Sequence, residues 1–93
     1  MKNEDVIIAF LKKERGTSQS LKSSKVKLFS YSTCIAQWED NHVLINPTSY
    51  TGTMDRNLTL LYKIISTSDI IYKDVSNYVP KECNDLIKYK IID

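Results

Sequence analysis

The sequence is poor in the residues that build catalytic and metal sites. Its 93 residues include one histidine, His42, two cysteines, Cys34 and Cys83, and two glycines. One histidine and two cysteines 49 residues apart match no zinc-ligand spacing. Two glycines cannot supply a glycine-rich loop that cradles phosphate. We therefore expect no enzymatic activity, no metal and no cofactor, and a function that rests on binding.

Long apolar runs are also missing. The longest, Val6 to Leu11, has six residues, whereas a membrane-spanning helix needs about 20. Lys12 and Lys13 follow this run too closely for the core of a signal peptide. Two cysteines make no disulfide framework, and we expect both to be small buried hydrophobic residues. The expectation is one domain, residues 1–93, located in the cytoplasm and without membrane contact.

What is present is typical of a globular domain, with 42% hydrophobic and 26% charged residues. The charge is unevenly placed. Residues 1–27 carry seven cations and three anions, whereas residues 28–93 carry six cations and eight anions. The two parts therefore hold +4 and −2, which sum to the net charge of +2. This distribution predicts a basic N-terminal third.

Two apolar patterns of helical period are present. The first follows Asn3, a suitable N-cap residue, and predicts a helix over about residues 4–15. Gly16 suits the position just after the end of this helix. The second, in which every third or fourth residue is apolar, predicts a helix over residues 54–65 with Thr53 as its N-cap. Residues 17–25 are polar apart from Leu21, and we expect a connector there.

Residues 26–46 alternate as strands do, with a turn at residues 39–42, and predict a three-stranded antiparallel meander. Residues 69–79 suit a strand but also the start of a helix. Pro80 suits the first position of a last helix of about ten residues. The expected fold class is α+β: an N-terminal helix, the meander, a helix, then a strand and a C-terminal helix.

The middle of the chain combines hydroxyl and aromatic residues, among them Leu28-Phe29-Ser30-Tyr31, Thr33, Asn46, Thr48 and Tyr50. With these residues it resembles a family of small uncharacterised domains from bacteriophages and other mobile elements. The resemblance covers residues 21–57. It implies a phage or prophage origin and a core of a β-hairpin followed by a helix, but no activity. The sequence departs from the family pattern at Met54, Asp55, Arg56 and Asn57, where the family has Thr-Ser-x-His. The matching residues are Leu28, Phe29, Ser30, Tyr31, Thr33, Ile35, Ala36, Trp38, Val43, Ile45, Asn46, Thr48, Tyr50 and Thr53.

The first functional hypothesis is a small inhibitor that binds a host protein or ribonucleoprotein complex, such as an anti-CRISPR or another anti-defence protein. The small size, the lack of catalytic groups and the phage resemblance favour it. Tyrosine and tryptophan are efficient interface anchors, although both are also ordinary core residues.

The second hypothesis is a nucleic-acid-binding module in which the basic N-terminal third contacts phosphates and Tyr31 or Trp38 stacks on unpaired bases. The same lysines also suit a solvated surface. Across both hypotheses, the candidate binding residues are Lys22, Lys25, Lys27, Tyr31, Trp38, Tyr50 and Arg56.

A homodimer with a structural or regulatory role is the third possibility. Several apolar residues near the C-terminal end suit a subunit interface, and they suit the completion of the core equally well. They are Ile70, Ile71, Val75, Tyr78, Val79, Ile91 and Ile92.

Overall fold

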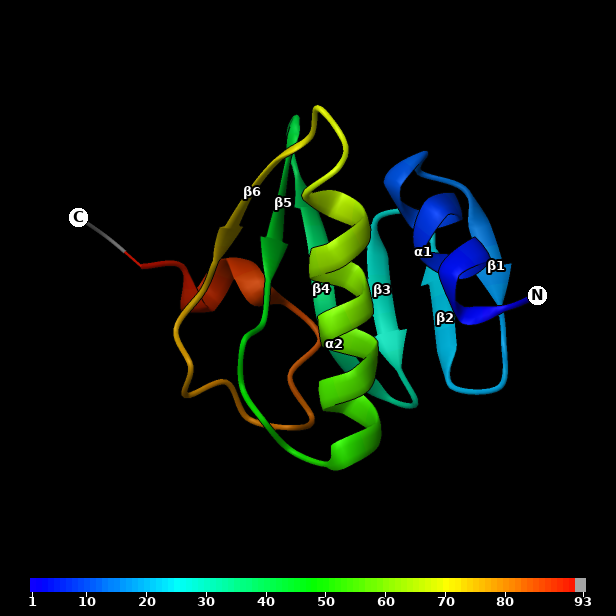
Figure 1. Cartoon of the computed structure of the whole chain (residues 1–93). Coiled ribbons are helices and arrows are strands. Elements are labelled where there is room, and N and C mark those ends of the chain that lie inside the picture. Colours follow the sequence, from blue (N-terminus) through cyan, green and yellow to red (C-terminus); the bar gives the residue numbers. More distant parts are fainter. Residues whose placement is uncertain (92–93) are drawn as a thin grey trace.

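Six strands form one sheet, and strands that follow each other in the chain are neighbours in it (Figure 1). The computed structural model describes residues 1–91. Its strands are β1 (Arg15–Thr17), β2 (Leu21–Ser24), β3 (Lys27–Ser30), β4 (Thr33–Glu39), β5 (His42–Ile45) and β6 (Ile71–Asp74). Strands β1 to β5 pair antiparallel as a meander, and β6 pairs parallel with β5. A parallel pair needs a crossover connection, which a helix between β5 and β6 supplies.

Two α-helices, α1 (Asn3–Leu11) and α2 (Gly52–Ile65), lie side by side on one face of the sheet (Figure 1). Their inward side chains and the sheet residues beneath them form the main core, whose burial drives folding. Within residues 1–91, no helix has the length and apolar composition needed to span a bilayer. The buried members of the main core are Val6, Ile7, Phe10, Leu21, Leu28, Ile35, Ala36, Val43, Ile45, Leu61 and Ile65.

The opposite face of the sheet is covered in part. After β6 the chain returns across this face to a single 3-10 turn, η1 (Leu86–Tyr89), which contacts β4 and β5. A second, smaller core forms there from Cys34, Leu44, Val75, Val79 and Leu86. Over β1 and β2, side chains on this face remain exposed to solvent. The sheet therefore has a covered half and an open half on the side away from the helices.

The α+β class is confirmed. The antiparallel meander is longer than the three strands predicted over residues 26–46, because β1 and β2 precede β3, β4 and β5 in it. The second helix is confirmed and begins two residues earlier than predicted. Its N-cap is Thr51, whose hydroxyl accepts a hydrogen bond from the amide of Met54 at 3.2 Å, and not Thr53. Within the ambiguous residues 69–79, the chain forms β6 at the edge of the sheet.

The first helix is shorter than predicted because it ends at Leu11. Lys13 takes the left-handed conformation that terminates the helix, with φ of 58°. Gly16 lies in β1 instead. A Cβ at this position would lie 3.0 Å from the Sδ of Met1 and 3.4 Å from the Cβ of Ala9 in α1.

The predicted connector over residues 17–25 is wrong, because β1 and β2 form a hairpin there. Strand patterns are recognised from alternating apolar residues. In this hairpin the positions that face α1 are held by Gly16, Leu21 and Ser23, so a single large apolar residue marks the inward side.

The predicted C-terminal helix is also wrong, because residues 80–91 contain only the 3-10 turn η1 over Leu86–Tyr89. The backbone amide of Leu86 donates to Oε1 of the buried Gln37 at 2.8 Å, and Asp85 accepts from the amide of Ile87. The bond to Gln37 attaches the segment to β4, and the buried side chain of Leu86 completes the second core. Tertiary contacts thus replace the helical hydrogen bonds that the local pattern predicts.

Candidate functional site

Side-chain alternation determines which residues of β1 to β3 face away from the helices. Leu21 and Leu28 belong to the main core, and the hydroxyl of Ser23 donates to a backbone carbonyl just after α1 at 2.6 Å. Gly16 lies against α1. Successive strand residues point to opposite faces. The residues that alternate with these four along β1, β2 and β3 therefore point to the open half of the sheet.

The open half presents two short rows of mainly polar side chains. Thr17 pairs with Lys22, which pairs with Phe29, and Arg15 pairs with Ser24 in the second row. Neighbouring strands lie about 5 Å apart and alternate residues about 7 Å apart, so these side chains share one patch. We call it the basic sheet face; it consists of Arg15, Thr17, Lys22, Ser24, Lys27 and Phe29.

Apart from Glu14, which precedes Arg15, the cations of this face have no carboxylate neighbours along the chain. No aspartate or glutamate occurs between Glu14 and Glu39, a stretch that includes all of β1, β2 and β3. Arg15 and Lys22 are exposed, whereas Lys27 is half-buried and donates to the carbonyl of Asn84 at 2.5 Å. Among residues 1–91, none of these three cations forms an ion pair. The face therefore carries a local excess of positive charge, which is offset at Lys27 by the nearby Asp85, whose carboxylate accepts from Gln37, the strand partner of Lys27.

Two neighbouring turns add further groups to the rim of the basic sheet face. Lys25 is exposed in the β2–β3 turn, and Tyr31, 58% exposed, begins the β3–β4 turn. Both residues have positive φ, 85° and 56° respectively, a conformation that favours glycine or asparagine. The amide of Tyr31 donates to the carbonyl of Ser20 at 2.8 Å, which holds this turn against β2.

Phe29 marks the boundary between the basic sheet face and the second core. Its half-buried ring packs against that core, and it pairs with Lys22 on one side and Cys34 on the other. Burial raises the pKa of the Cys34 thiol from 9.0 to about 12, against an opposing effect of Lys27. Cys34 is therefore a neutral core residue at neutral pH and unsuited to nucleophilic catalysis.

Trp38, a predicted binding residue, lies on the helix side of the sheet and away from the basic sheet face. Its indole nitrogen donates to the carbonyl of Phe10 at 2.9 Å, and the two rings lie 6.2 Å apart. The ammonium of Lys13 lies 4.7 Å from the indole ring. These contacts give Trp38 a packing role at the end of α1.

Tyr50 and Arg56 are also separate from the predicted lysines. Tyr50 is half-buried, and its hydroxyl donates to the carbonyl of Val79 and accepts from the side-chain amide of Asn46. It thereby fastens the chain after β6 to the loop before α2. Arg56 is exposed on α2, on the opposite side of the sheet from Lys22. Of the predicted set, Lys22 and Lys27 lie on the basic sheet face, and Lys25 and Tyr31 lie in the turns at opposite ends of β3.

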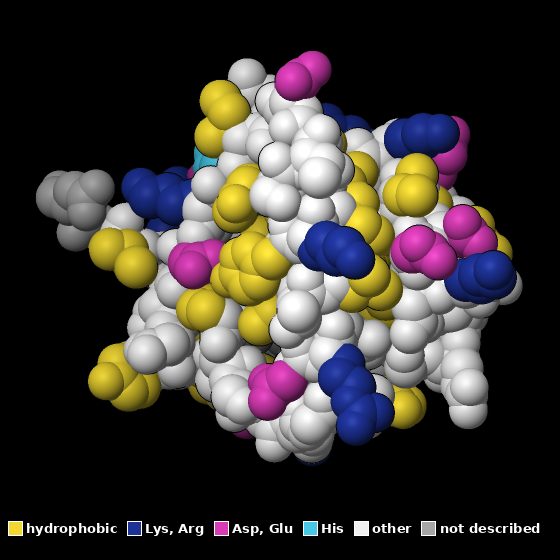
Figure 2. All heavy atoms as spheres, in the orientation of Figure 1, with side chains coloured by type: hydrophobic (Ala, Val, Ile, Leu, Met, Phe, Trp, Pro, Cys, Tyr) yellow, Lys and Arg dark blue, Asp and Glu magenta, His cyan; other side chains and the backbone are white. Residues whose placement is uncertain are grey.

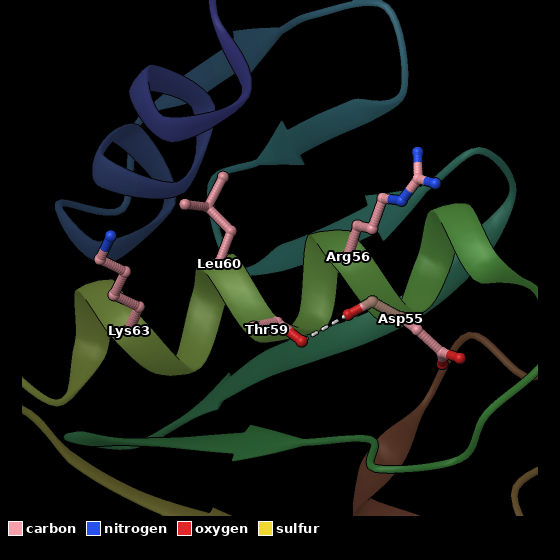
Figure 3. Close-up of a pocket in the computed structure, with 5 residues that line it drawn as sticks. All are labelled: Asp55, Arg56, Thr59, Leu60 and Lys63. Atoms are coloured by element: carbon pink, nitrogen blue, oxygen red, sulfur yellow. Dashed lines mark hydrogen bonds between the residues drawn. The ribbon is translucent and has the colours of Figure 1, made fainter.

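Two surface hollows offer no enclosed site. The first, about 420 Å³, is lined entirely by α2 (Figure 3). Figure 3 shows Arg56 and Lys63 projecting outward on either side of Leu60, while the hydroxyl of Thr59 donates to the carbonyl of Asp55. The second, about 500 Å³, lies beside β6 and includes Asp74. A ligand in either hollow would stay largely in contact with water, unlike ligands of enclosed pockets.

The single histidine, His42, is engaged in a contact at the surface. His42 lies 3.3 Å from the carboxylate of Glu39, which also pairs with Lys90 at 2.7 Å. Within the described part of the chain, no group of three or more histidine, cysteine, aspartate or glutamate side chains is placed to hold a metal ion.

Phe29 and Arg15 were not among the predicted binding residues. Arg15 was counted only among the cations of the N-terminal third. The signal for both was the alternation of the strands, because Arg15-x-Thr17, Lys22-x-Ser24 and Lys27-x-Phe29 each place two such residues on one face. Recognising it required knowing that residues 15–24 form a hairpin.

Comparisons with protein-family models, curated proteins and solved structures find no match for this chain.

Proposed function

We propose that the protein binds nucleic acid through the basic sheet face. The observation that carries this proposal is the set of three cations, Arg15, Lys22 and Lys27, on an open sheet surface without a carboxylate between residues 15 and 38. Lysine and arginine side chains that contact phosphates release condensed counterions, and this release supplies much of the affinity for nucleic acids. Exposed Lys25 extends the same charge along one edge.

The distribution of charge distinguishes this face from an ordinary solvated surface. On the helix side, Figure 2 shows acidic and basic side chains interspersed, as is usual for surfaces that serve solubility. The basic sheet face has one sign alone. A field of one sign over a flat surface attracts a polyanion and raises its rate of association.

Charge reversal tests this proposal. Lys22→Glu is expected to weaken binding of a fluorescein-labelled oligonucleotide by about tenfold or more, measured by fluorescence anisotropy at low salt. The matched control is Arg56→Glu, which makes the same change in net charge on α2. Equal weakening by the two variants would show that net charge alone acts, and absence of binding by the unmodified protein would refute the proposal.

A second candidate is protein binding, as expected of an inhibitor of a host complex or of a homodimer. Apolar side chains gather over β6 and the segment that follows it (Figure 2). Ile71, Tyr78 and Ile91 are 69%, 84% and 51% exposed, whereas Val75 and Val79 complete the second core. Ile70 is half-buried, and Ile92 lies outside the described residues. Exposed apolar groups gathered in this way favour a protein contact.

The two forms of this candidate are separated by mass and by mutation. A dimer in light scattering that becomes a monomer in Tyr78→Asp would support self-association. A monomer that captures a host complex, and loses it in Tyr78→Asp but not in Arg56→Glu, would support the inhibitor. A monomer whose capture is unaffected by Tyr78→Asp would exclude this surface.

A further inference from the structure

Two aromatic residues accompany the cations on the same strand and its turn. Lys27 and Phe29 occupy alternate positions of β3, and the exposed Tyr31 follows in the turn that begins after the strand ends at Ser30. Lys22 lies beside Phe29 in the register of β2 and β3. The half-buried ring of Phe29 therefore lies next to a basic side chain of the basic sheet face, and an exposed tyrosine follows in the adjoining turn.

A contribution to the stability of the fold does not explain why position 31 holds a tyrosine. Its φ of 56° lies in the region where an L-residue other than glycine or asparagine is disfavoured. Its ring is mostly exposed, so it gains little from burial. Among the described residues, its hydroxyl has no hydrogen-bond partner, in contrast to the hydroxyls of Tyr50 and Tyr62. A glycine at this position would fit the turn better and keep the fold.

We propose, on the basis of the function inferred above, that the ligand of the basic sheet face is a single-stranded nucleic acid, with one base stacked on Tyr31 and the backbone along Arg15, Lys22 and Lys27. An aromatic ring stacks on a base whose face is free, and in a duplex both faces of an internal base are occupied by its neighbours.

The roles of the two aromatic residues differ. Phe29 is held by the second core, so its exposed edge lies beneath the bound nucleic-acid strand. Tyr31 projects at the rim, where an unpaired base has access to its ring face. Because stacking tolerates every base, the site is expected to bind with little sequence preference. Lys22 and Lys27, which neighbour Phe29 on the same face, contact the phosphates that flank the stacked base.

The test compares Tyr31→Gly and Tyr31→Phe in anisotropy titrations with a thymidine DNA oligonucleotide of about 12 nucleotides, the matching uridine RNA and the corresponding duplex. Tyr31→Gly suits the backbone, so loss of binding is not loss of folding. It is expected to weaken single-strand binding by about tenfold, while Tyr31→Phe retains it. The tighter of the two single strands identifies the sugar that the site prefers.

Heparin, a polyanion without bases, separates this inference from the proposed function. Tyr31→Gly is expected to leave the affinity for heparin unchanged, whereas Lys22→Glu reduces it. If Tyr31→Gly binds the single strands as well as the unmodified protein does, or if the duplex binds as tightly as the single strands, the inference fails and the nucleic-acid proposal stands. If neither oligonucleotides nor heparin bind the unmodified protein, both fail.

Discussion

Asn57 shows at the residue scale how polar groups hold the two helices on the sheet. Its side chain is 2% exposed and donates to the hydroxyls of Ser20 at 3.2 Å and Ser30 at 2.9 Å. Its carbonyl oxygen accepts from the side chain of Asn3 at 3.3 Å. A buried network of this kind is stable when every member is paired, and the loss of one member leaves the others unsatisfied.

Asn57→Ala is therefore expected to destabilise the protein by about 1–3 kcal/mol, measured as the free energy of unfolding in urea. The control is Asn77→Ala, which alters an exposed asparagine and should change stability by less than about 0.5 kcal/mol. Equal effects of the two changes would mean that the network around Asn57 contributes nothing specific.

The buried thiol of Cys34 makes a second prediction at this scale. Its pKa is raised by burial from 9.0 to about 12, so above pH 9 the unfolded chain loses a proton that the folded chain retains. Stability is thus fully present below pH 9 and falls as the pH rises toward 12, by at most about 1.4 kcal/mol per pH unit from this group. Tyr62, whose pKa burial and the Asp74 carboxylate also raise, adds a loss of the same sign.

Cys34→Ala isolates the contribution of the thiol. The difference in unfolding free energy between the unmodified protein and this variant should shrink between pH 8 and pH 11, because the variant cannot lose that proton. Urea unfolding at several pH values measures it. A difference that stays constant over this range would contradict the raised pKa of the Cys34 thiol.

At the scale of elements, the start of α2 depends on one hydroxyl. Thr51 has extended backbone geometry and accepts the amide of Met54, which satisfies one of the free amides of the first turn. Thr51→Ala is expected to cost about 1 kcal/mol in thermal or urea unfolding. Thr53→Ala, within the first turn, is the matched control and should be nearly neutral. A larger cost at Thr53 would place the cap where the sequence pattern predicted it.

The two helices and the central meander could be predicted from the sequence because their apolar residues repeat with a clear period. The ends could not, because they depend on conformation and not on composition. Gly16 has the residue type of a helix C-terminal cap, yet Lys13 takes the left-handed conformation and Gly16 lies within β1. Glycine and lysine can each occupy either of these positions, so the sequence does not decide between the two helix ends before β1 packs against α1.

The site was predictable in part for a related reason. The cations of the N-terminal third are visible in the sequence, but their shared face depends on the β1–β2 hairpin, whose inward positions include Gly16 and Ser23. Trp38 was expected to bind because of its residue type, and its contacts with Phe10 and Lys13 give it a packing role instead. Residue type identified the candidates, and strand register determined which of them lie together.

At the scale of the whole molecule, charge and coverage are separated across the sheet. Both α-helices cover one face, and η1 covers the part of the other face over β4 and β5, which leaves the basic sheet face open. A net charge of +2 is small, so an interaction with nucleic acid depends on this local concentration of cations and should weaken strongly with salt.

The salt dependence gives the number of phosphate contacts. With Arg15, Lys22, Lys25 and Lys27 engaged, the slope of log affinity against log salt for a single strand should be about −3, or roughly a 50-fold loss from about 50 to about 200 mM salt. Lys25→Ala should reduce the slope by about 0.7. Anisotropy titrations at several salt concentrations measure both. A slope near zero would mean that phosphates are not the groups bound.

The most direct test of the central claim is a map of amide chemical-shift changes by NMR as a single-stranded oligonucleotide is added to the labelled protein. We expect the largest changes over residues 15–31, in β1, β2, β3 and their turns, and little change in α2 and β6. Changes centred on α2 or on β6 and the segment after it, or no changes at concentrations that saturate a micromolar site, would contradict a binding role for the basic sheet face.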